Sequence, residues 1–261
     1  MNLDLQGKNA LVCGSSKGIG KAVALELAML GANVTLVARS GNILMEVKEQ
    51  LDRSRKQKHD FLVADFSDTI DLKRKISGLV ATKPIHILIN NTGGPPGGPI
   101  IEADPEAFLS AYQQHLICNH LLVRAVLHGM QAAEYGRIVN IISTSVKQPI
   151  DGLGVSNTVR AAVANWAKTL ANEVGQAGIT VNNVLPGYTF TQRLEEIIQN
   201  RAAASGKSEE AIQEAMKKTV PAGRFADPSE IAAAVAFLAS PAAAYINGIN
   251  VPVDGGRTKS L

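Results

Sequence analysis

A glycine-rich segment near the amino terminus has the residue types and spacing to bind a dinucleotide. It reads Gly14-Ser15-Ser16-Lys17-Gly18-Ile19-Gly20 and follows an apolar run. Its glycines allow a tight turn and a close backbone approach to a pyrophosphate, whose charge would sit at the amino terminus of the next helix. An ordinary strand-to-helix turn is the alternative. The residues expected to bind the cofactor here are Gly14, Ser16, Lys17, Gly18, Ile19 and Gly20.

Two basic side chains indicate which dinucleotide is bound. An NAD-selective site places an acid after the second strand for the ribose hydroxyls, whereas an NADP site supplies positive charge for the 2′-phosphate. This chain has Ala38 at the acid position, followed by Arg39 and Ser40, and it has Lys17 in the glycine segment. The sequence therefore predicts NADP(H) in preference to NAD(H). Two surface bases placed there by chance would be the other explanation.

The elements that must position these residues alternate along the chain. Strands that are apolar on both faces, each followed by a helix, predict a parallel sheet covered on both sides, with right-handed crossovers. The expected fold is an α/β, single-domain, Rossmann-type doubly wound parallel sheet of about seven strands over residues 1–261. The predicted strands cover 9–13, 33–38, 60–64, 85–90, 137–142, 179–185 and 249–252, and the clearest helical patterns cover 18–30, 105–133, 155–174 and 228–238.

Composition narrows the class of protein. The chain has 261 residues, of which 46% are hydrophobic and 19% are charged, so it can bury a sizeable core and is far from disorder. A net charge of +3 is too small to mark a nucleic-acid surface. With Cys13 and Cys118 as the only cysteines and no leader pattern, a cytoplasmic location is expected. Neither a membrane span nor a metal site is predicted.

Residues 192–222 interrupt the alternation with charged helical segments. A solvated surface excursion is the simplest interpretation. Because the insertion follows the carboxyl end of a strand, where ligands of such sheets bind, we expect it to act as a substrate lid. The glycine- and proline-rich stretch 91–99 follows another strand and would form either a wall of the substrate pocket or a rigid connector.

Further motifs run through nearly the whole chain, and together they resemble the short-chain dehydrogenase/reductase family. The later ones resemble its 3-oxoacyl-carrier-protein-reductase branch. In chain order the motifs are the G-x-x-x-G-x-G segment, Asp65-Phe66, Asn90-Asn91-Thr92-Gly93, the strand from Gly136 to Ser143, Val181-Asn182 through Pro186-Gly187 to Thr191, Gly223-Arg224-Phe225, Pro228-Ser229-Glu230, and Asn247-Gly248 through Val253-Asp254-Gly255-Gly256.

The resemblance implies a fuller cofactor site and an assembly. It implies reduction or oxidation of a carbonyl/alcohol pair on a small-molecule or acyl-thioester substrate. It also implies a homotetramer formed through the two long helices 105–133 and 155–174 and through the carboxyl-terminal segment. An exposed small-residue face at Ala161, Ala164, Ala167 and Ala171 would permit this packing, although these alanines could instead point inward. The further cofactor contacts that it implies are Asp65, Phe66, Asn91, Thr92, Gly93, Arg160, Pro186, Gly187, Thr189 and Thr191.

The expected catalytic residues depart from the family pattern of serine, tyrosine, lysine and asparagine. Counting from Ser143 at the family's spacing places Ser156 at the tyrosine position and Arg160 at the lysine position, and His115 aligns with the asparagine. A serine hydroxyl is far less acidic than a phenol, whose pKa is about 10. Arg160 keeps a positive charge that could hold the nicotinamide ribose, but it does not replace a lysine conservatively.

His115 is the candidate replacement for the missing proton donor, because an imidazole titrates near neutrality. Simple packing between helices is the competing interpretation of His115. For Tyr188, the alternatives are a place facing the nicotinamide and a lid-packing role. The function expected is an NADP(H)-dependent oxidoreductase with an altered proton donor. A non-catalytic, NADP-binding partner of an active relative is the alternative, and a dehydratase or epimerase on the same fold stays open.

Overall fold

The computed structural model describes residues 1–260 and contains one seven-stranded sheet. All neighbouring strands are parallel, in the order β3-β2-β1-β4-β5-β6-β7. The predicted doubly wound Rossmann-type fold is therefore confirmed, with most strand boundaries within two residues of the expected ones. The strands are β1 Asn9–Cys13, β2 Asn33–Ala38, β3 Asp60–Val63, β4 Ile87–Asn90, β5 Gly136–Ile141, β6 Ile179–Pro186 and β7 Asn250–Val253.

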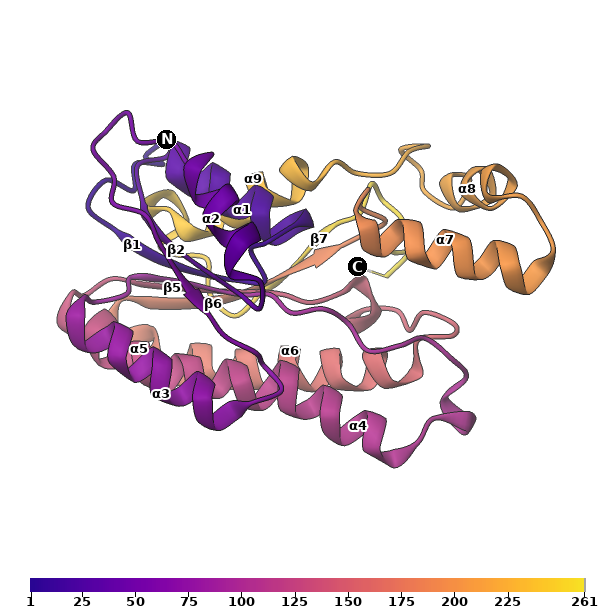
Figure 1. Ribbon diagram of the computed structural model, residues 1–261, viewed down its shortest axis with the longest axis horizontal. Helices are drawn as coiled ribbons and strands as arrows, with labels where there is room; N and C mark the ends of the chain where they lie inside the picture. Colours follow the sequence, from indigo (N-terminus) through magenta and orange to yellow (C-terminus); the bar gives the residue numbers. More distant parts are fainter. Residues whose placement is uncertain (261) are drawn as a thin grey trace.

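Helices cover both faces of this sheet (Figure 1). One face carries α1 Gly18–Met29, α2 Gly41–Glu49 and α9 Pro228–Ala239, and the opposite face carries α3 Thr69–Thr82, α4 Pro105–Tyr112, α5 Cys118–Ala132 and α6 Gly154–Val174. Each layer of helices buries its own apolar cluster against the sheet. Four short 3₁₀ turns are η1 Ile100–Glu102, η3 Thr144–Val146, η4 Gly175–Ala177 and η5 Pro241–Ala243.

The helix expected over 105–133 is present as one helical stretch from Pro105 to Ala132, but it is not α-helical throughout. It consists of α4 and α5 joined by a π-helical segment, η2 Gln113–Ile117, in which His115 and Leu116 are buried. A π turn adds one residue to the helical repeat and so changes which side chains face the sheet. The start of α4 is as predicted, because Asp104 accepts a hydrogen bond from the backbone N–H of Glu106 and proline occupies the first turn.

The charged insertion forms two further helices, α7 Gln192–Ser205 and α8 Glu209–Lys217, at one end of the molecule (Figure 1). They are held by a small apolar cluster of Leu194, Ile198 and Met216, against which Tyr188 and Phe225 pack. This cluster is separate from the two large ones, so the insertion has only a small apolar contact of its own.

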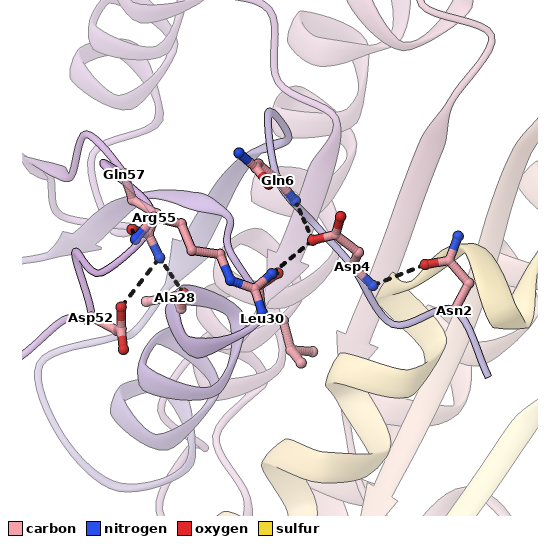
Figure 2. Close-up of polar contacts among 8 residues, drawn as sticks. All are labelled: Asn2, Asp4, Gln6, Ala28, Leu30, Asp52, Arg55 and Gln57. Carbon is pink, nitrogen blue, oxygen red and sulfur yellow. Dashed lines mark hydrogen bonds and ion pairs between the residues drawn. The ribbon is translucent and has the colours of Figure 1, made fainter.

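Polar contacts tie the amino-terminal segment to the loop between α2 and β3 (Figure 2). Asp4 accepts a hydrogen bond from Arg55 at 2.9 Å, and the Gln57 side chain donates to the Ala28 carbonyl at the end of α1, also at 2.9 Å. Gln57 is buried, and its amide is a second donor to the Ala28 carbonyl, which also accepts from the Gly31 N–H at 2.9 Å. The network fixes the carboxyl end of α1, at the far end from the glycine segment.

The prediction that α6 exposes a face of four alanines for subunit contacts is wrong, and the alternative, that they point inward, holds for three of them. Ala164, Ala167 and Ala171 are buried against the rest of the chain, and only Ala161 of the four is exposed. Alanine at these positions lets α6 pack close to the sheet. Among residues 1–260, no helix is both long enough and apolar enough to cross a membrane.

Candidate active site

The glycine segment joins β1 to α1 in a conformation that requires its glycines. Gly14 has φ +59, and a Cβ at this position would lie 2.5 Å from the carbonyl oxygen of Asn91. At Gly20, a Cβ would lie 2.2 Å from the Gly14 carbonyl oxygen. The Asn91 amide donates to the carbonyls of Cys13 and Gly14 at 3.3 and 3.2 Å. Asn91, expected as a cofactor contact, therefore holds the glycine segment itself.

The amino terminus of α1 is suited to a phosphate. Lys17 stands at the N-cap without a side-chain hydrogen bond to the first turn, so no side chain there competes for the backbone N–H groups of α1. Ser15 is buried, and its hydroxyl accepts from the Val37 N–H at 2.9 Å, which fixes the segment against β2. Ser16 lies between Ser15 and Lys17, and Gly18 and Ile19 are the first two residues of α1. The arrangement fits the pyrophosphate of a dinucleotide.

Positive charge flanks this terminus, as the sequence predicts. Lys17 and Arg39 are both exposed, Arg39 directly after β2 and Lys17 in contact with the Gln192 side chain at the start of α7. Ser40 follows as the N-cap residue of α2. The pKa of Asp65 is lowered by hydrogen bonds from Ser67 and, to a smaller extent, by the charge of Arg39. The segment containing Asp65 and Phe66 therefore lies within the electrostatic reach of Arg39.

The segment after β6 leads from the sheet to α7. Gly187 lies so close to Asp254 that a Cβ would be 2.6 Å from the Asp254 Cα, which excludes a larger residue after Pro186. Thr189 is buried, and Thr191 caps α7 by accepting from the Leu194 N–H. A Cβ on Gly18 would touch the Thr191 methyl at 3.3 Å, so the glycine segment and the α7 terminus adjoin.

Ser143 lies two residues after the end of β5. Its hydroxyl accepts from the Ser145 N–H at 3.0 Å and caps the turn η3. Ser156 lies in the first turn of α6 and is half-buried. Four residues farther along α6, Arg160 is buried, with 8% of its surface exposed.

Thr92, His115 and Arg160 form one polar chain. The Thr92 hydroxyl shares a hydrogen bond with Nδ1 of His115, and the Thr92 carbonyl accepts from Arg160 at 3.3 Å. Arg160 also donates to the Ile141 carbonyl at 3.3 Å. The chain thus joins the π turn, the segment after β4, the end of β5 and α6. Gly93 and Gly94 follow Thr92, and a Cβ on Gly94 would lie 4.0 Å from the guanidinium.

The electrostatics of this chain contradict the expected titration of His115 near neutrality. Burial and the neighbouring charge of Arg160 lower the pKa of His115 to about 2. An imidazolium would lose its hydration and lie beside a cation, so the ring stays neutral at physiological pH. Burial also lowers the pKa of Arg160, to about 10, which leaves the guanidinium charged at neutral pH.

A ladder of asparagines, not predicted from the sequence, crosses the sheet behind the site. Asn90 donates to Asn140, Asn140 to Asn183, and Asn183 to Asn250, each at 2.8 Å. These residues occupy matching positions in β4, β5, β6 and β7. An asparagine recurring near the end of successive predicted strands was the available signal.

Two further segments border the site. Tyr188 packs edge to face with Phe225 at 6.0 Å between ring centres, within the apolar cluster of the insertion, which supports the lid-packing interpretation. The glycine- and proline-rich stretch is tied to α7, because Arg193 donates to the Pro95 carbonyl at 3.1 Å. This contact brings both segments that were expected to border the substrate to one place.

Comparison with known proteins agrees with this geometry. The family profile described as enoyl-(acyl carrier protein) reductase matches residues 14–258. The 3-oxoacyl-[acyl-carrier-protein] reductase FabG of Pseudomonas aeruginosa is 35% identical over 262 residues, which cover 99% of this chain and all of that protein. The NADPH-dependent reductase BacG of Bacillus subtilis is 28% identical over 258 residues, with 97% and 99% of the two chains covered.

A similar solved structure is the L-sorbose reductase of Gluconobacter frateurii, in complex with NADPH and L-sorbose. It superimposes with a TM-score of 0.93 at 29% identity and covers the whole of both chains. The fold, the glycine segment and these full-length similarities lead to one assignment. The chain belongs to the short-chain dehydrogenase/reductase family of NAD(P)-dependent oxidoreductases.

Proposed function

We propose that this protein is an NADP(H)-dependent oxidoreductase that interconverts a carbonyl compound and its alcohol. The observation that carries the proposal is the pair of exposed cations, Lys17 and Arg39, beside the uncapped terminus of α1. The cofactor contacts would be those expected from the sequence, with Asn91 acting through the glycine segment. The relatives named for NADPH support the choice of dinucleotide, and the 3-oxoacyl-carrier-protein reductases support a small ketone or a 3-oxoacyl thioester as substrate.

The choice of cofactor can be tested by fluorescence titration with NADPH and NADH. Because charge-assisted contacts contribute about 1.5 to 3 kcal/mol each, NADPH should bind about tenfold more tightly or better. Arg39→Asp should weaken NADPH and leave NADH nearly unchanged. Lys73→Asp, a charge reversal at an exposed lysine of α3, is the control. Equal affinities for the two cofactors in the wild type would contradict the proposal.

In the proposed reaction, NADP(H) supplies the hydride when it is bound, and the protein must orient the substrate and provide a proton. The Ser143 hydroxyl, at the end of β5, would donate a hydrogen bond to the substrate oxygen. Arg160 would supply positive charge beneath the nicotinamide ribose, although two backbone carbonyls already accept hydrogen bonds from it. His115 would donate only its neutral N–H, or hold a water molecule, so Ser156 and water are the groups left to deliver the proton.

One observation favours a second candidate, a non-catalytic NADP-binding partner of an active relative. His115 is neutral, and its Nδ1 is engaged by Thr92, so the polar chain serves the packing of four elements and leaves no strong acid in the site. Loss of a positioned acid or base typically costs about two to four orders of magnitude in rate.

The two candidate functions can be distinguished with substrates whose reduction depends least on a proton donor. Electron-poor ketones such as diketones and 3-oxo thioesters should be reduced slowly by an enzyme of this kind. If the protein binds NADPH tightly and reduces none of them, while Ser156→Tyr with Arg160→Lys gains activity, the non-catalytic candidate is the correct one. His115→Ala tests the role of His115 separately: an unchanged rate would remove His115 from the mechanism while leaving the oxidoreductase proposal intact.

The remaining proposals concern the location of the protein, its assembly and partners, and the role of the insertion. We place the protein in the cytoplasm as a homotetramer, with neither nucleic acid nor membrane as partner, and we treat α7 and α8 as a lid over the substrate within a single domain. The contacts of Lys17 with Gln192 and of Arg193 with Pro95 support the lid, because they link α7 to both the cofactor side and the substrate side of the site.

A further inference from the structure

A small cavity lies beside the turn that begins at Ser143. Its volume is about 150 Å³, and it lies between the segment after β5, the end of the insertion and the carboxyl-terminal tail. A cavity of about this size accommodates a molecule as large as benzene. The lining residues are Thr144, Gln148, Pro149, Ile150, Thr219, Arg257, Thr258 and Lys259.

The described charged residues that line this cavity are basic. Arg257 and Lys259 line it, and none of the lining residues within the described part of the chain, 1–260, is acidic. Within residues 1–260, no carboxylate lies within ion-pairing distance, 4.0 Å, of the Arg257 guanidinium. An anion bound in the cavity would form charge-assisted hydrogen bonds with these cations.

Arg257 is also held in position. Its guanidinium carbon lies 4.3 Å from the centre of the Tyr188 ring, and one of its amino groups donates to the Tyr188 hydroxyl at 3.1 Å. The Tyr188 ring is fixed in turn by its edge contact with Phe225. These contacts set the plane of the guanidinium and leave its other N–H groups for a ligand, as two-pronged recognition of a carboxylate or phosphate requires.

The tail that carries Arg257 is anchored on both sides. The Asp254 carboxylate accepts from the N–H groups of Gly256 and Thr258, at 3.0 and 2.8 Å, and the Lys259 N–H donates to the Gln148 side chain at 3.3 Å. Asp254 is the nearby negative charge, and these backbone N–H groups already solvate it. The cavity wall is thus a built turn that faces the segment after Ser143.

We propose that this cavity binds the negatively charged group of the substrate, so that the physiological substrate is a small carbonyl compound bearing a carboxylate or a phosphate. The inference rests on the proposed function only in taking the substrate to be a carbonyl compound. Arg257 is the residue that determines specificity, and Lys259 adds charge at the rim. Thr144 adjoins Ser143, which places the anionic group close to the carbonyl.

The test compares matched ligands that differ in charge, by calorimetry on the full chain saturated with NADP⁺. Acetoacetate is compared with methyl acetoacetate for the carboxylate, and dihydroxyacetone phosphate with dihydroxyacetone for the phosphate. At least one anion should bind about fivefold more tightly than its neutral partner, or better. The pair with the larger ratio identifies which anion the site prefers.

The variants assign the effect to the cavity. Arg257→Gln should bring the ratio close to one, Arg257→Lys should restore part of it, and Lys259→Gln should reduce it. Arg201→Gln, at an exposed arginine of α7, should leave it unchanged. Equal binding within both pairs in the wild type, or a ratio unchanged in Arg257→Gln, would overturn the inference. Binding of NADPH is measured on separate portions of the same protein preparations before NADP⁺ is added, so a failure of the proposed cofactor site is detected independently.

Discussion

At the scale of single residues, three positions behave as one unit. Thr92, His115 and Arg160 come from three separate segments of the chain, and in the fold Thr92 contacts both of the other two. The Arg160 guanidinium carries several N–H donors in a planar fork, whereas a lysine would carry one compact charge. Two of its nitrogens donate to backbone carbonyls. A cation held there disfavours protonation of His115, and so the neutral imidazole and the buried guanidinium belong together.

We predict that His115 does not titrate between pH 5 and 8. Its pKa is about 2 in the folded chain, because of burial and the Arg160 charge, against about 6.5 in an unfolded chain. In an NMR titration, its ring proton shift should stay constant. Arg160→Gln removes the repulsion and should raise the pKa of His115. A His115 resonance that moves through a midpoint near pH 6.5 would contradict the neutral assignment.

The same pKa difference predicts how stability changes with pH. Below pH 6.5 the unfolded chain takes up a proton at His115 that the folded chain refuses, so the free energy of unfolding falls as pH decreases, down to the folded pKa. The contribution approaches about 1.4 kcal/mol per pH unit. Urea unfolding of the wild type and of His115→Asn at pH 5 and pH 7.5 isolates the contribution of His115. The pKa values of His59 and His86 are also lowered, but these residues are present in both proteins, so their effect cancels in the comparison. The same pH dependence of the free energy of unfolding in both proteins would disprove this prediction.

At the scale of elements, the sheet is held together at its functional end by side chains as well as by its backbone. The asparagine ladder connects β4, β5, β6 and β7, and the first oxygen of the ladder, Oδ1 of Asn90, is buried without a partner. Amides satisfy one another across parallel strands only when the register is fixed, because a shift of one residue would send each to the other face. The ladder therefore fixes how far Asn91 and Ser143, which follow β4 and β5, lie along the strand direction relative to each other.

We predict that Asn140→Ala destabilises the fold by about 3 kcal/mol, because it leaves the amide of Asn90 and the oxygen of Asn183 unpaired in the interior. Chemical denaturation measures the change. Asn42→Ala, at an exposed asparagine of α2, should cost less than about 0.5 kcal/mol. Similar effects of the two substitutions would show that the ladder adds little to stability.

The insertion is the element whose behaviour should change on cofactor binding. Gln192, at the start of α7, contacts Lys17, which we expect to bind the cofactor phosphate. Backbone amides of α7 should therefore exchange hydrogen more slowly when NADPH is added, while those near the middle of α3 provide the internal reference. Unchanged exchange in α7 at saturating NADPH would contradict its role as a lid.

At the scale of the whole molecule, α5 and α6 present their outer faces on one side of the sheet (Figure 1). His120 of α5 lies edge to face with Trp166 of α6, with ring centres 6.3 Å apart. Since three of the four alanines point inward, the surface available for subunit contacts is formed by the exposed residues His120, Arg124, His128, Ala161, Asn165 and Lys168.

We predict a homotetramer assembled through this surface. Light scattering at micromolar concentration should give about four times the 27.6 kDa mass of the chain. Ala161→Arg should reduce the mass, because a long charged side chain would be placed between packed helices. Ser77→Arg, at an exposed position of α3, is the control. A wild-type protein that scatters as a monomer would rule this assembly out.

The sequence by itself determined the sheet, the parallel direction of its strands, the glycine segment and the family. These depend on local patterns: apolar runs of strand length, caps such as Asp104-Pro105, and glycines at a fixed spacing. Each pattern acts within a few residues of itself, so it can be interpreted without knowing what lies across the fold.

Only the tertiary structure decided how the unusual residues behave. The type of residue predicts that His115 titrates near neutrality, but the π turn buries it and α6 brings Arg160 alongside, which reverses that prediction. The alanines of α6 fit an exposed face or an inward one equally well by spacing, and only the packing of α6 shows that three of them point inward. Desolvation and contacts between distant segments control both outcomes, and neither is encoded by nearest neighbours along the chain.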